Sequence, residues 1–183
     1  GYLLFSGIAS AAVDHFSHGE TVMGRQGGVG HYEGDAAVDR DGYMTNLLAD
    51  RAIEEVRAAV TAGGPFLLSL HFTAPHCPWQ RPTDRPLPPH ASLWHHDGGD
   101  LETFGEMVRP MDAAIGRVLA EIDRLGATRD TIIVFTSDNG GERFSDTWPL
   151  RGGKGELLEG GIRVPLIMRW PGLRAKGWTF APG

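Results

Sequence analysis

The sequence predicts an α/β fold, a layered domain with a mostly parallel central sheet flanked by helices. Two long stretches have apolar side chains at helical spacing, residues 43–62 and 101–125, and each is followed by a short apolar or β-branched run. The sequence contains no visible internal repeat. Helix and strand that alternate along a chain favour layers built around a parallel sheet.

The first helix is predicted from its stripe of apolar residues between Met44 and Val60. Gly63 and Gly64 close it, and Pro65 prevents its continuation. Residues 66–72 form a short apolar run bounded by turn residues, which predicts a buried strand. The preceding residues 6–42 are rich in Gly, Asp and His, so we expect a loop with little regular structure there.

The second half of the chain has the same order, a helix followed by strands. Residues 101–125 predict a second helix that ends at Gly126, and residues 131–136 and 166–170 predict strands. Between the halves lies a loop at residues 73–99, rich in proline and histidine; loops of this length are usually functional or disordered. No linker divides the chain, so we expect one domain over residues 1–183.

Composition excludes several classes of protein. The 183 residues are 41% hydrophobic and 22% charged, as in ordinary globular proteins. The net charge of -6 argues against broad nucleic-acid binding but leaves room for a local cationic cleft that binds an anion. No stretch approaches the roughly 20 apolar residues of a membrane span. A single cysteine, Cys77, rules out an internal disulfide and does not indicate the redox compartment.

The predicted strand at residues 131–136 leads into a candidate metal site. Asp138 and Asn139 follow it, and Gly140 and Gly141 come next. Carboxylate and amide oxygens are hard ligands suited to Ca²⁺ or Mg²⁺. The alternative is a turn in which both side chains bond their own backbone, and composition alone favours that turn.

Two further residues are candidates for chemistry on an anion. Lys154 stands among glycines, where it can donate an ammonium to an anionic group or lie solvated on the surface. His76 is flanked by Pro75 and by Pro78, which could hold its ring in place for proton transfer, although a loop histidine is more often simply exposed. We interpret the neighbouring Cys77 as a packing residue rather than a nucleophile.

In this order, the segments of the chain resemble the sulfatase family of the alkaline-phosphatase-like superfamily. The strongest match covers residues 131–172, and supporting matches precede it. The matching segments are Thr131 to Gly141, Leu150 to Gly155, Glu159 to Pro165, Trp170 to Gly172, Leu70 to His76, Met111 to Gly116 and Asp14 to His18.

The resemblance implies a role for each candidate. Asp138 and Asn139 would be two protein ligands of Ca²⁺, with Mg²⁺ as the alternative. Lys154 would bind the sulfate and stabilise its developing charge, and His76 would bind the ester oxygen and help to protonate the leaving alcohol. The substrate would be a small sulfated molecule, an aryl sulfate or a sulfated sugar, and the compartment extracytoplasmic.

The chain also departs from the family pattern. Family members convert a Cys or Ser in a Cys/Ser-x-Pro-x-Arg motif to formylglycine, whereas here proline directly follows Cys77 and an Asp-Asp pair is missing. We therefore expect an internal fragment, inactive alone, without the N-terminal nucleophile segment and the C-terminal subdomain. Two alternatives remain open: a phosphatase or phosphodiesterase of the same superfamily, and a non-catalytic relative that binds sulfated glycans.

Overall fold

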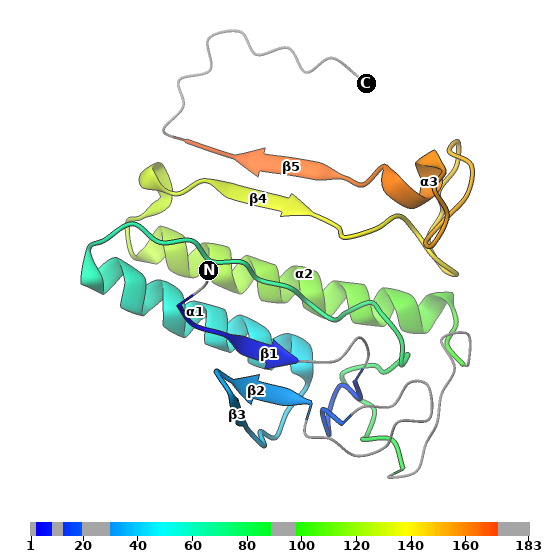
Figure 1. Cartoon of the computed structure of the whole chain (residues 1–183), viewed down its shortest axis with the longest axis horizontal. Coiled ribbons are helices and arrows are strands. Elements are labelled where there is room, and N and C mark those ends of the chain that lie inside the picture. Colours follow the sequence, from blue (N-terminus) through cyan, green and yellow to red (C-terminus); the bar gives the residue numbers. More distant parts are fainter. Residues whose placement is uncertain (1–2, 9–12, 20–29, 89–97, 172–183) are drawn as a thin grey trace, which may run out of the picture. The chain divides into compact units, whose positions relative to one another are not determined.

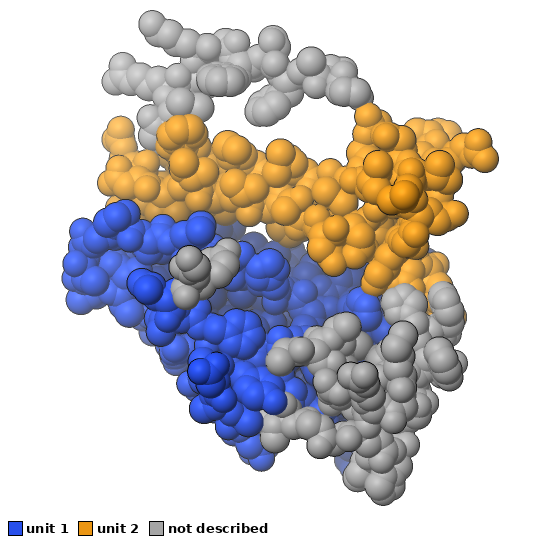
Figure 2. Space-filling view, in the orientation of Figure 1, with its two compact units in different colours: residues 1–121 blue, residues 122–183 orange. Residues whose placement is uncertain are grey.

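A computed structural model describes residues 3–8, 13–19, 30–88 and 98–171. Contacts divide the chain into two compact units, residues 1–121 and residues 122–183, which Figure 2 shows in different colours. The boundary lies inside a helix rather than at a linker. Each unit is described by itself below.

Two parallel helices dominate the first unit. α1 runs from Met44 to Ala62 and α2 from Leu101 to Arg124, and Figure 1 shows them side by side. Arg57 of α1 pairs with Glu121 of α2 at 2.6 Å, and Asp50 pairs with Arg117, so residue numbers rise in the same direction along both helices. Both predicted helices are therefore confirmed.

The ends of the helices follow the predicted signals. Gly63 adopts a left-handed conformation with φ of 71°, and its amide bonds the carbonyls of Ala59 and Val60. Only glycine takes this conformation without a steric cost, so it ends the helix cleanly. Gly126 plays the same part after α2, with φ of 71°. The apolar face of α1 packs inward: Met44 and Leu48 form a core with Val13, against which Ile8, Leu70 and Phe72 pack.

A small antiparallel sheet precedes α1, in a region where the sequence predicted loop. β1 (Ser6–Ile8) pairs with β2 (His31–Glu33), which pairs with β3 (Ala36–Ala37). The prediction of little regular structure at residues 6–42 was thus wrong for these strands. They are two or three residues long and are defined by their pairing, and runs this short show no readable alternation.

The predicted buried strand at residues 66–72 was also wrong. The segment is extended but has no strand partner among the described residues, and Leu67 is 78% exposed. Only Leu70 and Phe72, at its end, pack against the core. An apolar run indicates a tendency to be buried, but a strand also needs a neighbour to complete its hydrogen bonds.

The second unit is built on a two-stranded ribbon. The short 3-10 helix η1 (Thr128–Asp130) leads into β4 (Ile133–Thr136), which pairs antiparallel with β5 (Leu166–Arg169), and the four-residue α3 (Glu159–Ile162) precedes β5. Both strands confirm the prediction. Their side chains Val134, Phe135, Leu166 and Ile167 are all exposed. Every strand pair in the described ranges is antiparallel, so the parallel central sheet stays a prediction.

Candidate functional site

The residues predicted to bind metal lie at the exit of β4. Asp138 is exposed and Asn139 is half-buried, in a bend where the Ser137 hydroxyl donates to the Asn139 carbonyl at 2.9 Å. The described residues contain no group of three or more His, Cys, Asp or Glu side chains arranged to hold a metal ion. Two oxygen donors suit part of the shell of a hard cation, which takes six to eight ligands when it is Ca²⁺.

Glycines join this bend to the segment that carries Lys154. The Gly140 amide donates to the Gly161 carbonyl at 2.8 Å, and the Lys154 amide donates to the Gly141 carbonyl at 2.9 Å. A Cβ on Gly140 would lie 1.9 Å from the Gly160 oxygen, and one on Gly161 would lie 2.4 Å from the Gly153 oxygen. The three backbone segments approach so closely that side chains at these glycines would collide. We call residues 138–142, 151–156 and 158–161 the glycine-packed cluster.

The Lys154 side chain leaves this cluster largely covered. It is 24% exposed, and its ammonium lies 3.5 Å from a carboxylate oxygen of Glu142. An ordinary surface lysine keeps its head in water, so the covered side chain favours the functional interpretation over a solvated one. The structure therefore brings Lys154 and the bend at Asp138 into one cluster within the second unit.

His76 lies in a turn of the first unit. Its amide donates to the Thr73 carbonyl at 2.9 Å, and its ring Nδ1 lies 2.8 Å from the Cys77 carbonyl. A carbonyl can only accept, so Nδ1 carries a proton. Cys77 is a buried thiol, as expected for a packing residue. Because His76 and Lys154 belong to different units, the action of both residues on one sulfate ester, which the resemblance implies, stays a prediction.

Behind the His76 turn lies a buried polar network that sequence reasoning missed. Asp14 is fully buried, and its carboxylate accepts hydrogen bonds from the Gln80 side chain at 2.7 Å and from the Leu87 amide at 2.8 Å. The amides of Phe16 and Ser17 donate to its other oxygen. Burial raises the pKa of the Asp14 carboxyl, but these hydrogen bonds outweigh burial and hold the pKa below its ordinary value.

The same network continues through Gln80 to His15 and Tyr43. The Gln80 side-chain oxygen accepts from the His15 amide at 2.8 Å, and the Tyr43 hydroxyl donates to the Gln80 carbonyl at 3.0 Å. The rings of His15 and Tyr43 stack with centroids 5.4 Å apart. The Asp14 to His18 motif was visible in the sequence, but its partner Gln80 lies 66 residues from Asp14 and no local pattern links them.

His15 connects the network to the His76 turn. Its Nε2 lies 3.4 Å from the His76 carbonyl, while Nδ1 is buried with no hydrogen-bond partner in the described part of the chain. Burial lowers the pKa of His15 to about 4, despite the His76 carbonyl, which raises it. The ring is therefore neutral near pH 7, with its one proton on Nε2 facing the carbonyl.

Comparison with known proteins decides the family. The family model described as Sulfatase matches residues 10–179, which is most of the chain.

The chain belongs to the sulfatase family.

Two curated mouse sulfatases illustrate the relationship. The chain is 38% identical over 141 residues to a steryl-sulfatase of Mus musculus, which covers 71% of this chain and 20% of the relative. It is 31% identical over 182 residues to arylsulfatase J of the same species, covering 97% of this chain and 30% of the relative. The chain thus spans about a fifth to a third of the length of these sulfatases.

A solved structure supports the α/β class. The crystal structure of Ps i-CgsB in complex with k-i-k-neocarrahexaose is similar with a TM-score of 0.65 and 30% identity, over 77% of this chain and 31% of that one. Among the helices that the structure describes in our chain, none is both long and apolar enough to cross a membrane.

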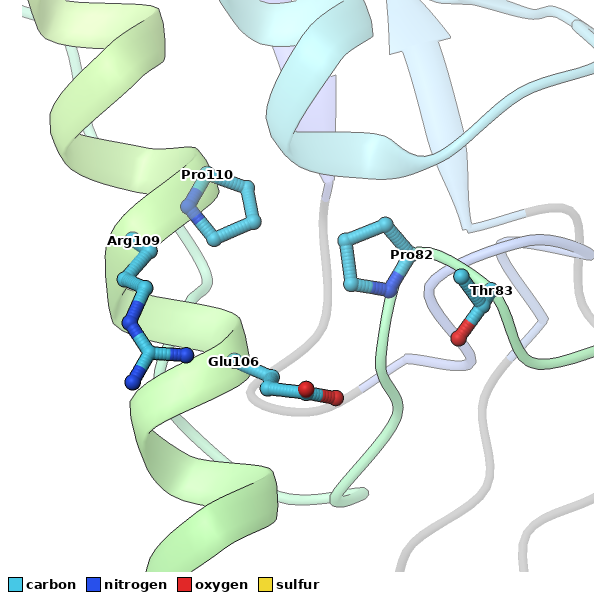
Figure 3. Close-up of a pocket in the computed structure, with 5 residues that line it drawn as sticks. All are labelled: Pro82, Thr83, Glu106, Arg109 and Pro110. Atoms are coloured by element: carbon cyan, nitrogen blue, oxygen red, sulfur yellow. The ribbon is translucent and has the colours of Figure 1, made fainter.

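A shallow pocket in the first unit of this sulfatase chain contains none of the four predicted site residues. It has a volume of about 230 Å³, and its lining residues are Pro82, Thr83, Glu106, Arg109 and Pro110. Figure 3 shows the first two on a loop that faces α2, which carries the other three. Glu106 already pairs with Arg81 at 3.3 Å.

Proposed function

We propose that this chain carries the sulfate-binding and metal-binding part of an enzyme that hydrolyses sulfate esters. The observation that supports it most directly is the glycine-packed cluster, which holds a mostly covered lysine beside a bend with two oxygen donors. Membership of the sulfatase family gives this arrangement its chemical meaning. An ammonium held in a protected site stabilises the charge on a sulfate more strongly than one in water.

Each site residue has a role in this proposal. Lys154 binds a non-bridging oxygen of the sulfate and stabilises the charge that develops there. Glu142, 3.5 Å away, orients the ammonium before the substrate arrives. His76 exchanges a proton through Nε2, because its Nδ1 bonds the Cys77 carbonyl, and so protonates the leaving alcohol.

The proposed metal is Ca²⁺, with Mg²⁺ as the alternative. The Asp138 carboxylate and the Asn139 amide are hard oxygen donors, and exposed Asp138 can reach a ligand. They supply only part of a coordination shell in the described residues. Such a cation, when bound, would polarise the sulfate oxygens. The contribution of the chain is to hold both donors close to Lys154.

The proposed substrate is a small sulfated molecule, either an aryl sulfate or a sulfated sugar, and the proposed compartment is extracytoplasmic. We further propose that residues 1–183 alone are inactive, because the sequence has no Cys/Ser-x-Pro-x-Arg motif. Purified chain should show no measurable turnover of an aryl sulfate. Robust turnover would contradict this part of the proposal.

Lys154→Ala in the full-length sulfatase tests the central claim. We expect kcat/KM on 4-nitrophenyl sulfate to fall by at least about tenfold, since the charge on the sulfate loses its cation. Arg163→Ala is the matched control, because it removes an exposed cation of the same unit that pairs with Glu159 at 3.0 Å. We expect less than about a twofold change from it. Equal rates in Lys154→Ala and wild type would remove Lys154 from the mechanism.

A further inference from the structure

In the buried network of the first unit, hydrogen bonds lead from Asp14 through Gln80 to His15. Gln80, 3% exposed, stands at its centre: its amide nitrogen donates to Asp14 at 2.7 Å, and its oxygen accepts from the His15 amide at 2.8 Å. The nitrogen also lies 3.3 Å from the Arg85 carbonyl. Both ends of the Gln80 side chain are therefore bonded, which fixes the loop before Arg81 to the segment that carries His15.

From His15 the contacts lead to the candidate acid. His15 Nε2 lies 3.4 Å from the His76 carbonyl, and its ring is held by stacking on Tyr43. The His76 turn is closed on the other side by the Thr73 carbonyl. The turn is thus held at its backbone from two directions, while Nδ1 of the His76 ring bonds the Cys77 carbonyl.

We infer that Asp14, Gln80 and His15 are positioning residues that set the place of the His76 ring for proton transfer to the leaving group. This inference rests on the proposed role of His76. Hydrogen bonds of these residues reach the backbone of the turn and of the loop after it, so we assign them an indirect role, exerted through the position of His76.

The cost of the network supports a positioning role. The buried Asp14 carboxylate and the buried His15 Nδ1, which has no hydrogen-bond partner among the described residues, each destabilise the fold, and apolar side chains of similar size would pack the same space at a lower cost. What the hydrogen bonds of Asp14 and Gln80 add is one defined geometry. Geometry matters for this step because a displacement of about 1 Å can lower a rate by roughly a hundredfold.

Two substrates separate positioning from simple stability in the full-length sulfatase. The leaving group of 4-nitrophenyl sulfate departs without much help from an acid, whereas the alcohol of an alkyl sulfate needs a proton. His76→Ala should therefore lower kcat on the alkyl sulfate by about a hundredfold and on the nitrophenyl ester by less than about tenfold. Gln80→Leu should show the same dependence on the leaving group: kcat should fall by about tenfold on the alkyl sulfate and by about twofold on the nitrophenyl ester, with KM unchanged.

Thr103→Val is the matched control. Its hydroxyl accepts from the Arg81 guanidinium at 3.0 Å, so it holds the same loop without touching the network. It should lower kcat on both substrates equally or not at all. If Gln80→Leu does not fold, His15→Phe decides, since phenylalanine keeps the ring stacked on Tyr43 and loses only the contact to the His76 carbonyl.

The outcomes distinguish this inference from the proposed function. A leaving-group dependence in His76→Ala, together with equal losses on both substrates in Gln80→Leu and His15→Phe, would overturn the positioning role and leave the function intact. No leaving-group dependence in His76→Ala would overturn the proposed role of His76 itself. A shared dependence in all three variants would support both.

Discussion

The loop that carries His76 and the cluster that carries Lys154 are held in place by different means. Around His76 the contacts are made by buried side chains, above all Asp14 and Gln80, whose segments lie 66 residues apart in the sequence. Around Lys154 they are made by backbone atoms, which approach one another because glycines leave room. The structure around His76 thus depends on buried polar and ionisable side chains, and the structure around Lys154 depends on glycines, which have no side chain.

The two regions should therefore respond differently to substitution and to pH. Removal of a buried carboxylate leaves all of its hydrogen-bond donors without an acceptor at once. A glycine at a close backbone approach tolerates no added atom, but it is indifferent to pH. Four measurements on the 183-residue chain test this contrast, and they follow in order of decreasing effect.

Asp14→Ala should destabilise the chain most. It leaves the Gln80 amide and three backbone amides without their acceptor in a buried site, which should lower the free energy of unfolding by more than about 3 kcal/mol. Urea denaturation followed by circular dichroism measures this. Asp35→Ala is the control, because that carboxylate is exposed. A loss below about 1 kcal/mol would mean that water replaces the carboxylate, and the network would not be the main support of the loop.

Acid should weaken the first region selectively. Burial lowers the pKa of His15 to about 4 in the fold, so between its unfolded value near 6.5 and pH 4 only the unfolded chain binds the proton. Stability should therefore fall by roughly 3 kcal/mol as pH drops through that window. Burial also lowers the pKa of His31, which adds to the loss. Denaturation midpoints at pH 7 and pH 4.5 test this, and His15→Phe should flatten the dependence.

Gly140→Ala should disrupt the glycine-packed cluster. The new Cβ would lie 1.9 Å from the Gly160 oxygen, so backbone must move, at a cost of about 2 kcal/mol. Amide hydrogen exchange should show faster exchange at Gly161 and at Lys154, while the first unit keeps its protection. Unchanged exchange at Lys154 would show that this contact does not hold the lysine in place.

Gly116→Ala should have the smallest effect, with the opposite sign. Gly116 lies in the exposed face of α2 with nothing within 4 Å of a Cβ, and alanine favours a helix over glycine. We expect a gain of about 0.5–1 kcal/mol in the free energy of unfolding. A thermal melt measures this. Destabilisation would show that close backbone packing extends beyond the Lys154 region.

The two regions also differ in how far the sequence predicted them. The helices α1 and α2 follow from their apolar spacing, and β4 and β5 from short β-branched or apolar runs, because each signal is local. The glycines around Lys154 are visible in the sequence, but the close backbone approaches that they allow are seen only in the fold. Asp138, Asn139 and Lys154 were all chosen from such local patterns.

The buried network could not be predicted in this way. Asp14 and Gln80 are distant in sequence, and neither belongs to a periodic stripe. The prediction of a strand at residues 66–72, which have no strand partner among the described residues, failed for a related reason, since apolar composition does not specify a hydrogen-bonding neighbour. Side-chain pairs and strand partners are properties of the folded chain, and a single sequence reports them only indirectly.

The open ribbon of β4 and β5 has a practical consequence. Four apolar side chains of this ribbon are exposed to solvent: Val134, Phe135, Leu166 and Ile167. In the described ranges each of the two strands pairs along one edge only. Such ribbons recruit further strands, often from identical molecules. Samples of the isolated chain should consequently self-associate as concentration rises, and dilute conditions or a solubilising fusion will be needed to keep it monomeric.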